Sequence, residues 1–179
     1  SYSVLNRRDF YVENVLVNRG KGRNIGVDIT LERYLNKGLY YMMTASIFDS
    51  KYYGGDRKWR NTLYNRNFIV NVLGGKEWMV GRDKQNMFSV NFKITWQGGD
   101  RYAPVDEVAT LLDPDREVQY DETKAFSKQF SPMFITNFSV GYKINRKKVS
   151  HEFAIKSLNT TGCEEYYGHE YNFKTDKIK

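Results

Sequence analysis

The chain has 179 residues, enough for one ordinary domain with a sizeable core. Lys and Arg number 28 against 21 Asp and Glu, but this formal charge of +7 is dispersed and selects no single class of partner. The single cysteine, Cys163, excludes an intrachain disulfide framework and a CxxC metal or redox motif. No run of about 18 apolar residues is present, so no transmembrane helix is expected.

Alternation of apolar and polar residues with a period of two predicts a succession of strands and almost no helix. The predicted strands are residues 26–35, 39–52, 67–80, 88–96, 131–144 and 149–158. The stretch 88–96, "FSVNFKITW", alternates almost without interruption, whereas Arg33 breaks the apolar side of the first strand. Gly74 and Gly75 interrupt the third strand and predict a bend or bulge there. The chain is therefore expected to be all-β.

The connections between these strands alternate in length. Residues 36–38 ("NKG"), 82–86 ("RDKQN") and 145–148 ("NRKK") are short, whereas residues 53–66, 98–129 and the tail after residue 159 are long. Short turns at one end of an antiparallel meander and long loops at the other are typical of outer-membrane barrels.

Aromatic residues make up 16% of the chain, and several recur along a strand at a spacing close to the height of the apolar band of a membrane barrel. Eight steps along a strand span about 26 Å, or roughly 20 Å of height at a tilt of about 40–45°, against an apolar band of about 25 Å. The pairs with this kind of spacing are Phe88 and Trp96, Phe134 and Tyr142, and, with ten steps, Phe68 and Trp78. Rings on an alternating face also fill the core of a soluble sandwich, so the pattern leaves the direction of each face open.

No catalytic constellation is present. The two histidines, His151 and His169, lie in "HEFAI" and "HEYNF", which lack the second histidine of a HExxH zinc site. There is no GxSxG, Walker or GxGxxG motif. Asp113, Asp115 and Glu117 are interpreted as a solvated loop rather than a calcium site. We therefore expect no enzyme activity, cofactor or metal, and no nucleic-acid partner, because the basic "NRKK" turn lacks interleaved aromatic residues.

Four runs in this order resemble the C-terminal part of the barrel of Bacteroidetes TonB-dependent receptors, over roughly residues 10 to 170. They are "NIGVDITLERYLNKGLYYMMTASIFDSKY", "WRNTLYNRNFIVNVLGGKEW", "WQGGDRYAPVDE" and "FSPMFITNFSVGYKINRKKVSHEFAIKSLN". Family members have a 22-stranded outer-membrane barrel with an N-terminal plug, and the TonB complex drives their import of ligands. The family barrel ends in an aromatic-terminated strand, whereas this sequence ends in "FKTDKIK" and contains neither plug nor TonB box.

The resemblance implies a fragment, residues 1–179, of one receptor barrel, with about six strands of an antiparallel transmembrane meander and the last strand missing. It implies localisation in the bacterial outer membrane and four partners: the remainder of the barrel with its plug, the TonB complex, membrane lipid and an imported ligand. The alternative is a soluble all-β binding domain whose basic surface recruits an acidic partner.

The site predictions follow from this interpretation. Lys93 is expected to face the lumen. The residues expected to face lipid are Phe88, Val90, Phe92, Ile94 and Trp96. The candidates for ligand contact in the long loops are Trp59, Arg60, Arg101 and Tyr102.

Overall fold

The computed structural model describes residues 3–4 and 15–178; residues 10–14, where the resemblance begins, and Lys179 lie outside these ranges. The fold is all-β, with 54% strand and 6% helix, which confirms the predicted class. In the described part of the chain, no helix has the length and apolar character needed to cross a membrane.

The elements are six long strands and several short ones. The long strands are β1 (Lys21–Asn36), β2 (Leu39–Tyr53), β4 (Phe68–Val80), β5 (Asn86–Gln97), β8 (Met133–Asn145) and β9 (Ser150–Ser157). The short strands are β3 (Trp59–Asn61), β6 (Arg101–Tyr102), β7 (Lys128–Gln129), β10 (Tyr171–Asn172) and β11 (Lys177–Ile178). The helices are α1 (Glu107–Leu112) and the 3₁₀ turn η2 (Glu122–Lys124).

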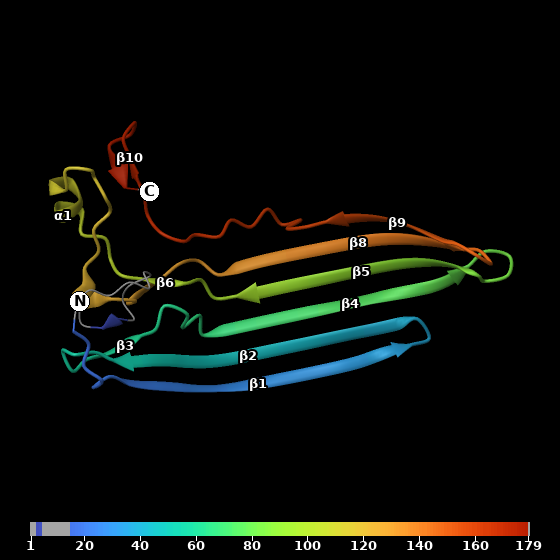
Figure 1. Ribbon diagram of the computed structural model, residues 1–179, viewed down its shortest axis with the longest axis horizontal. Coiled ribbons are helices and arrows are strands. Elements are labelled where there is room, and N and C mark those ends of the chain that lie inside the picture. Colours follow the sequence, from blue (N-terminus) through green and yellow to red (C-terminus); the bar gives the residue numbers. More distant parts are fainter. Residues whose placement is uncertain (1–2, 5–14, 179) are drawn as a thin grey trace.

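The long strands form one antiparallel meander in the order β1-β2-β4-β5-β8-β9, and β3 adds to β2 (Figure 1). From β2 onward, each long strand pairs with the long strand that precedes it in the chain, because the connection between them reverses the chain direction. The sheet is open: in the described residues, β1 and β9 form its two edges and do not pair with each other.

The β1–β2 hairpin has the tight turn that "NKG" predicts. Lys37 and Gly38 have φ values of 50° and 76°, the left-handed pair that a two-residue hairpin turn needs. A Cβ on Gly38 would lie 2.2 Å from the carbonyl oxygen of Glu77, whose own N–H donates to the Gly38 carbonyl at 2.7 Å. Gly38 is therefore required both by its conformation and by the close approach of β4.

The predicted bulge at Gly74 and Gly75 is wrong. The register of β4 runs without a shift past both glycines, against β2 on one side and β5 on the other. A Cβ on Gly74 would meet the Phe92 ring at 3.2 Å, and one on Gly75 would meet the hydroxyl of Tyr40 at 2.7 Å. The glycines make room for large side chains of the neighbouring strands, one on each face of the sheet.

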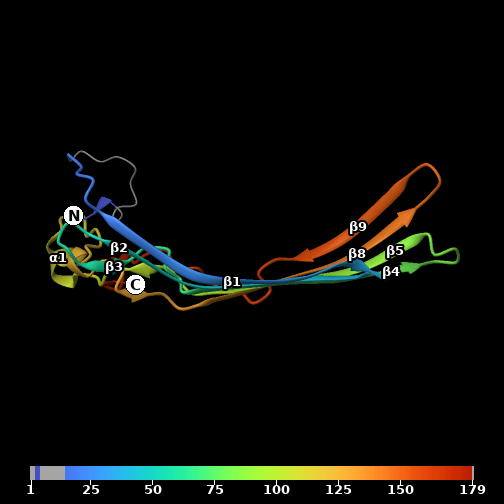
Figure 2. The ribbon, with the colours of Figure 1, turned by 90° about the horizontal axis from the view of Figure 1, so that it is seen from below.

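The two ends of the sheet differ. The hairpin turns β1–β2, β4–β5 and β8–β9 lie at one end, whereas α1, β3, β6 and the long connections gather at the other (Figure 1). Viewed edge-on, the sheet is a single twisted layer (Figure 2). The small core of buried residues, Tyr52, Ala125 and Phe126, lies in the loop cluster with Leu63 packed against it. The faces of the sheet, by contrast, have no covering layer among the described residues.

Candidate functional site

One face of the sheet is apolar across all six long strands. Residues paired directly across an antiparallel ladder point to the same side, so the register identifies the members of each face. The β5 members are the five residues expected to face lipid, Phe88, Val90, Phe92, Ile94 and Trp96, and the register shows that they share one face. Their neighbours include Val27, Ile29, Leu31, Met43, Ile47, Val70, Val72, Val140, Phe153 and Ile155. We refer to this surface as the apolar face.

The apolar face is exposed rather than packed. The side chains of Phe92, Trp96 and Phe138 are 43%, 48% and 46% exposed, and Ile155 reaches 81%. A contiguous apolar surface of this extent marks contact with lipid or with another protein, because such surfaces are rare on soluble monomers.

Aromatic rings run across the strands in rows near the ends of the apolar face. At the turn end, Trp78, Phe88, Tyr142 and Phe153 are paired in one continuous row from β4 to β9. The first two rings lie 5.7 Å apart. At the loop end, Trp96 pairs with Phe134 and packs against Phe68 at 4.7 Å. A third pair, Phe92 and Phe138, lies midway. The eight-step spacing read along single strands is thus matched by rows across strands.

The opposite face carries a hydrogen-bonded polar ladder. The hydroxyl of Tyr40 donates to Oδ1 of Asn91 at 2.7 Å, passing over Gly75, and Nδ2 of Asn91 donates to Oγ of Ser139 at 3.2 Å. Thr95 donates to Asn71 at 2.9 Å on the same side. Lys93 lies on this face and is exposed. Apolar residues such as Leu73 and Ile135 also occur here, so the face is mixed rather than wholly polar.

Trp59 and Arg60, two of the predicted ligand contacts, lie in β3 and line a cavity of about 260 Å³. The side chain of Trp59 is 49% exposed, whereas Arg60 is buried. Arg60 donates two hydrogen bonds to the carboxylate of Asp56, at 2.8 and 2.6 Å, and a third to the carbonyl of Thr123 at 2.9 Å. The two bonds to the carboxylate, together with the charge of Arg60, lower the pKa of Asp56 to about 2. Arg60 therefore holds two loops together, and Trp59 is the more accessible of the pair.

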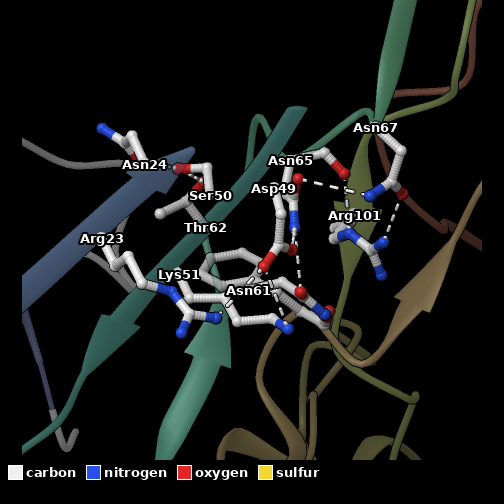
Figure 3. A network of polar contacts seen from close by, with 11 residues as sticks. Arg23, Asn24, Asp49, Ser50, Lys51, Asn61, Thr62, Asn65, Asn67 and Arg101 are labelled. Carbon is white, nitrogen blue, oxygen red and sulfur yellow. Dashed lines mark hydrogen bonds and ion pairs between the residues drawn. The ribbon is translucent and has the colours of Figure 1, made fainter. Parts of the chain in front are cut away.

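Arg101 belongs to a network of polar contacts at the loop end of β1 and β2 (Figure 3). Its guanidinium donates to the Asn65 carbonyl and to Oδ1 of Asn67, both at 2.7 Å. Asn65 is fully buried and donates to Asp49 at 3.1 Å, and Asp49 also pairs with Lys51 at 3.2 Å. Burial lowers the pKa of Arg101 below its usual range. The network fixes the direction in which the 98–102 segment leaves the sheet.

Next to this network, Arg101 and Tyr102 line a second cavity, of about 470 Å³, within the size range of small-molecule sites. Tyr120, Phe126, Tyr167 and His169 contribute to its wall, with Gln119 and Glu122 as polar members. Tyr102 stacks on Phe130 at 4.3 Å, and the His169 ring lies 4.9 Å from Tyr102. Rigid aromatic walls with a few polar groups suit a ligand with a flat face. We call this the aromatic cavity.

His169 is one of several residues of the aromatic cavity that the sequence does not predict as ligand contacts. Its backbone N–H donates to the Tyr120 hydroxyl at 3.1 Å, and its ring lies 5.5 Å from that of Phe130. Burial lowers the pKa of His169, so the neutral imidazole is favoured at neutral pH. Only the high tyrosine content of the long segments hinted at such a cluster, and no local motif joins residues about 50 positions apart.

The acidic residues after α1 and the other histidine, His151, form no metal site in the described part of the chain. Oδ1 of Asp113 accepts the N–H groups of Asp115 and Glu117 at 3.0 and 3.2 Å, which closes the turn after α1. Among the described residues, no group of three or more His, Cys, Asp and Glu side chains is placed to hold a metal ion. His151 lies on β9 opposite Ile144 and is exposed.

Comparison with known proteins finds no matching family model, no matching curated protein and no matching solved structure.

Proposed function

We propose that this chain is part of an outer-membrane TonB-dependent transporter that imports a ligand into the periplasm, and that its six long strands are consecutive strands of the transmembrane barrel. The observation that carries the proposal is the exposed apolar face, bounded by aromatic rows at both ends of an antiparallel meander. Strands of outer-membrane barrels have an apolar band on the outside, aromatic girdles at its two edges and a polar interior.

In this proposal, the apolar face contacts lipid and the face with Tyr40, Asn91 and Lys93 lines the lumen. The three short hairpin turns, β1–β2, β4–β5 and β8–β9, lie on the periplasmic side, and the loop cluster lies outside the cell. The free edges of β1 and β9 pair with the remaining strands of the barrel, because an unpaired backbone edge is not tolerated in lipid. The plug and the TonB complex act through the rest of the protein.

The imported ligand is proposed to meet this chain at the loop end. The aromatic cavity combines Tyr102 and His169 with the polar side chain of Arg101, whereas Trp59 offers an exposed ring at the smaller cavity. Arg60 contributes indirectly, because its guanidinium already binds Asp56 and the 123 carbonyl.

Spin labels at positions 92 and 93 of the full-length protein in bilayers test the proposal. The two side chains are adjacent on β5 and point to opposite faces. We expect the label at 92 to be accessible to oxygen dissolved in the bilayer and the label at 93 to a polar, water-soluble relaxation agent. The reverse pattern would overturn the proposal. A label at 92 that is shielded from both reagents, with the label at 93 in water, would favour the soluble binding domain instead, because the apolar face would then pack into a core.

A further inference from the structure

The apolar face is hollowed near its turn end. A cavity of about 510 Å³ opens there between β1, β2, β4 and β5. Apart from Lys76, the side chains that line it are aliphatic or aromatic. They include Leu31, Met43, Val72, Trp78, Val90 and Phe92. We call this cavity the apolar hollow.

The apolar hollow lies beside a step between two hairpins. Pairing of β2 with β4 ends at Leu39 and Lys76, whereas pairing of β4 with β5 continues to Val80 and Asn86. The tip of the β1–β2 hairpin therefore lies short of the tip of the β4–β5 hairpin, and β4 continues beyond it (Figure 1). Trp78, on this continuing part of β4, is 42% exposed and forms one wall of the hollow.

Three cations surround the step. Arg33 is paired with Tyr41, and Lys76 with Leu39, which places both cations on the apolar face. Lys37 is in the turn itself, and its carbonyl accepts a hydrogen bond from Nζ of Lys76 at 2.7 Å.

This positive charge is not compensated locally. Within the described part of the chain, none of the three cations forms an ion pair. The nearest acidic residues in the sequence, Glu32 and Glu77, are paired with Met42 and Ser89 and lie on the opposite face. The apolar hollow thus has a cationic rim, and the described strands around it place no acidic side chain on the apolar face at this end. Asp83, in the turn between β4 and β5, forms no ion pair with these cations.

We propose that the apolar hollow binds one anionic phospholipid of the leaflet at the turn end, with an acyl chain in the hollow and the phosphate against Arg33, Lys37 and Lys76. The inference rests on the proposed function, since it requires the apolar face to lie in a bilayer. An acyl chain matches the aliphatic and aromatic wall, and long basic side chains extend to the headgroup level while their stems stay in the apolar layer. Clustered Lys and Arg at a membrane surface select anionic lipids by charge.

Tryptophan quenching by brominated lipids tests this in the full-length protein, because the free edges of β1 and β9 need the other strands of the barrel. Any tryptophan outside these 179 residues is replaced by phenylalanine. In one version Trp78 is the sole tryptophan (Trp59→Phe, Trp96→Phe); in the other Trp96 is the sole one (Trp59→Phe, Trp78→Phe). Each is incorporated into phosphatidylcholine vesicles with a small fraction of lipid brominated in its acyl chains, either phosphatidylglycerol or phosphatidylcholine. We expect brominated phosphatidylglycerol to quench Trp78 preferentially and to show no preference at Trp96.

Variants separate the two parts of the site. Arg33→Gln and Lys76→Gln should each lower the relative association constant for phosphatidylglycerol at Trp78 about fivefold, the effect of one cation near an anionic surface. Val72→Phe fills the hollow and should reduce quenching, whereas Val70→Phe, on the same strand and face but outside the hollow, should not.

The outcomes distinguish this inference from the proposed function. Equal quenching of Trp78 by the two lipids, unchanged by Arg33→Gln and Lys76→Gln, overturns the inference and leaves the apolar face in lipid. Absence of quenching at both tryptophans overturns the proposed function together with the inference.

Discussion

Two identical substitutions on one strand test whether the apolar face spans a bilayer. Phe88 and Phe92 are both on β5 and on the same face, and they differ in their distance from the aromatic rows. Phe88 is a member of the turn-end row, whereas Phe92 is four residues from both Phe88 and Trp96 and so lies midway. Phe88→Lys and Phe92→Lys therefore introduce the same charge at two depths.

The magnitude follows from that geometry. Four residues correspond to about 13 Å along the strand and about 10 Å of depth at the usual tilt. A lysine facing lipid costs about 2–4 kcal/mol at the bilayer midplane and about 0–1 kcal/mol near the interface. Phe92→Lys should thus destabilise the folded chain by about 2–3 kcal/mol more than Phe88→Lys, since both lose one phenyl ring. This corresponds to about a 30- to 150-fold difference in the folding equilibrium constant.

The assay is a urea titration of the full-length protein carrying each substitution, in phospholipid vesicles, followed by the β-sheet signal in far-ultraviolet circular dichroism. Equal destabilisation by the two substitutions would refute the reasoning, because a face in water or in a protein core has no depth axis of this kind. A larger loss of stability from Phe88→Lys than from Phe92→Lys would mean that Phe92 is not at the centre of the apolar layer. The aromatic rows would then not mark its boundaries.

Three further outcomes are expected. Gly38→Ala should destabilise the chain by about 1–3 kcal/mol, because Gly38 has a left-handed φ and an added Cβ would clash with β4. Lys37→Gly, at the neighbouring left-handed position, should be neutral or stabilising. Urea titrations of the two variants would contradict this if Lys37→Gly were the more destabilising. Because the folded-state pKa of Asp56, about 2, is below the ordinary 3.8, its stabilising contact with Arg60 is present above the ordinary value and is lost as pH falls through about 2. Hydrogen exchange over residues 54–61 should increase in that range, and Asp56→Asn should remove the pH dependence. Tyr40→Phe removes a 2.7 Å hydrogen bond from β2 to β5 and should cost about 1 kcal/mol, so an unchanged urea midpoint would argue against that bond.

The strands and short turns could be predicted from the sequence because their signals are local. The predicted strand 88–96 corresponds to β5, and "NKG" supplies the left-handed turn. The start of β1 was missed, since Arg23 and Asn24 do not alternate with apolar residues; instead they contact Asp49 and Ser50 across the ladder. Such cross-strand contacts depend on register, which a single strand does not reveal.

The loop cluster could be predicted only as a set of candidate residues. Arg101 and Tyr102 do line a cavity, but their partners Tyr120 and His169 come from segments far along the chain. The sequence does not predict that Arg60 is buried, because its contacts with Asp56 and Thr123 form only when the two loops are folded. The error at Gly74 has a similar origin: glycine in a strand signals either a bulge or a large neighbour, and only the register distinguishes the two.

The described residues bury too little apolar surface for the sheet to be stable without a covering layer. The buried hydrophobic residues among those described are only Tyr52, Ala125, Phe126 and Met133, of which the first three cluster at the loop end. A stable domain needs at least two packed layers, so a single twisted sheet with exposed rings requires a second layer from elsewhere. A protein layer imposes no fixed distance between aromatic rows on the face that it covers. Lipid accounts better for aromatic rows near both ends and for cations at the rim of the apolar hollow, since the bilayer has a polar boundary at each of those levels.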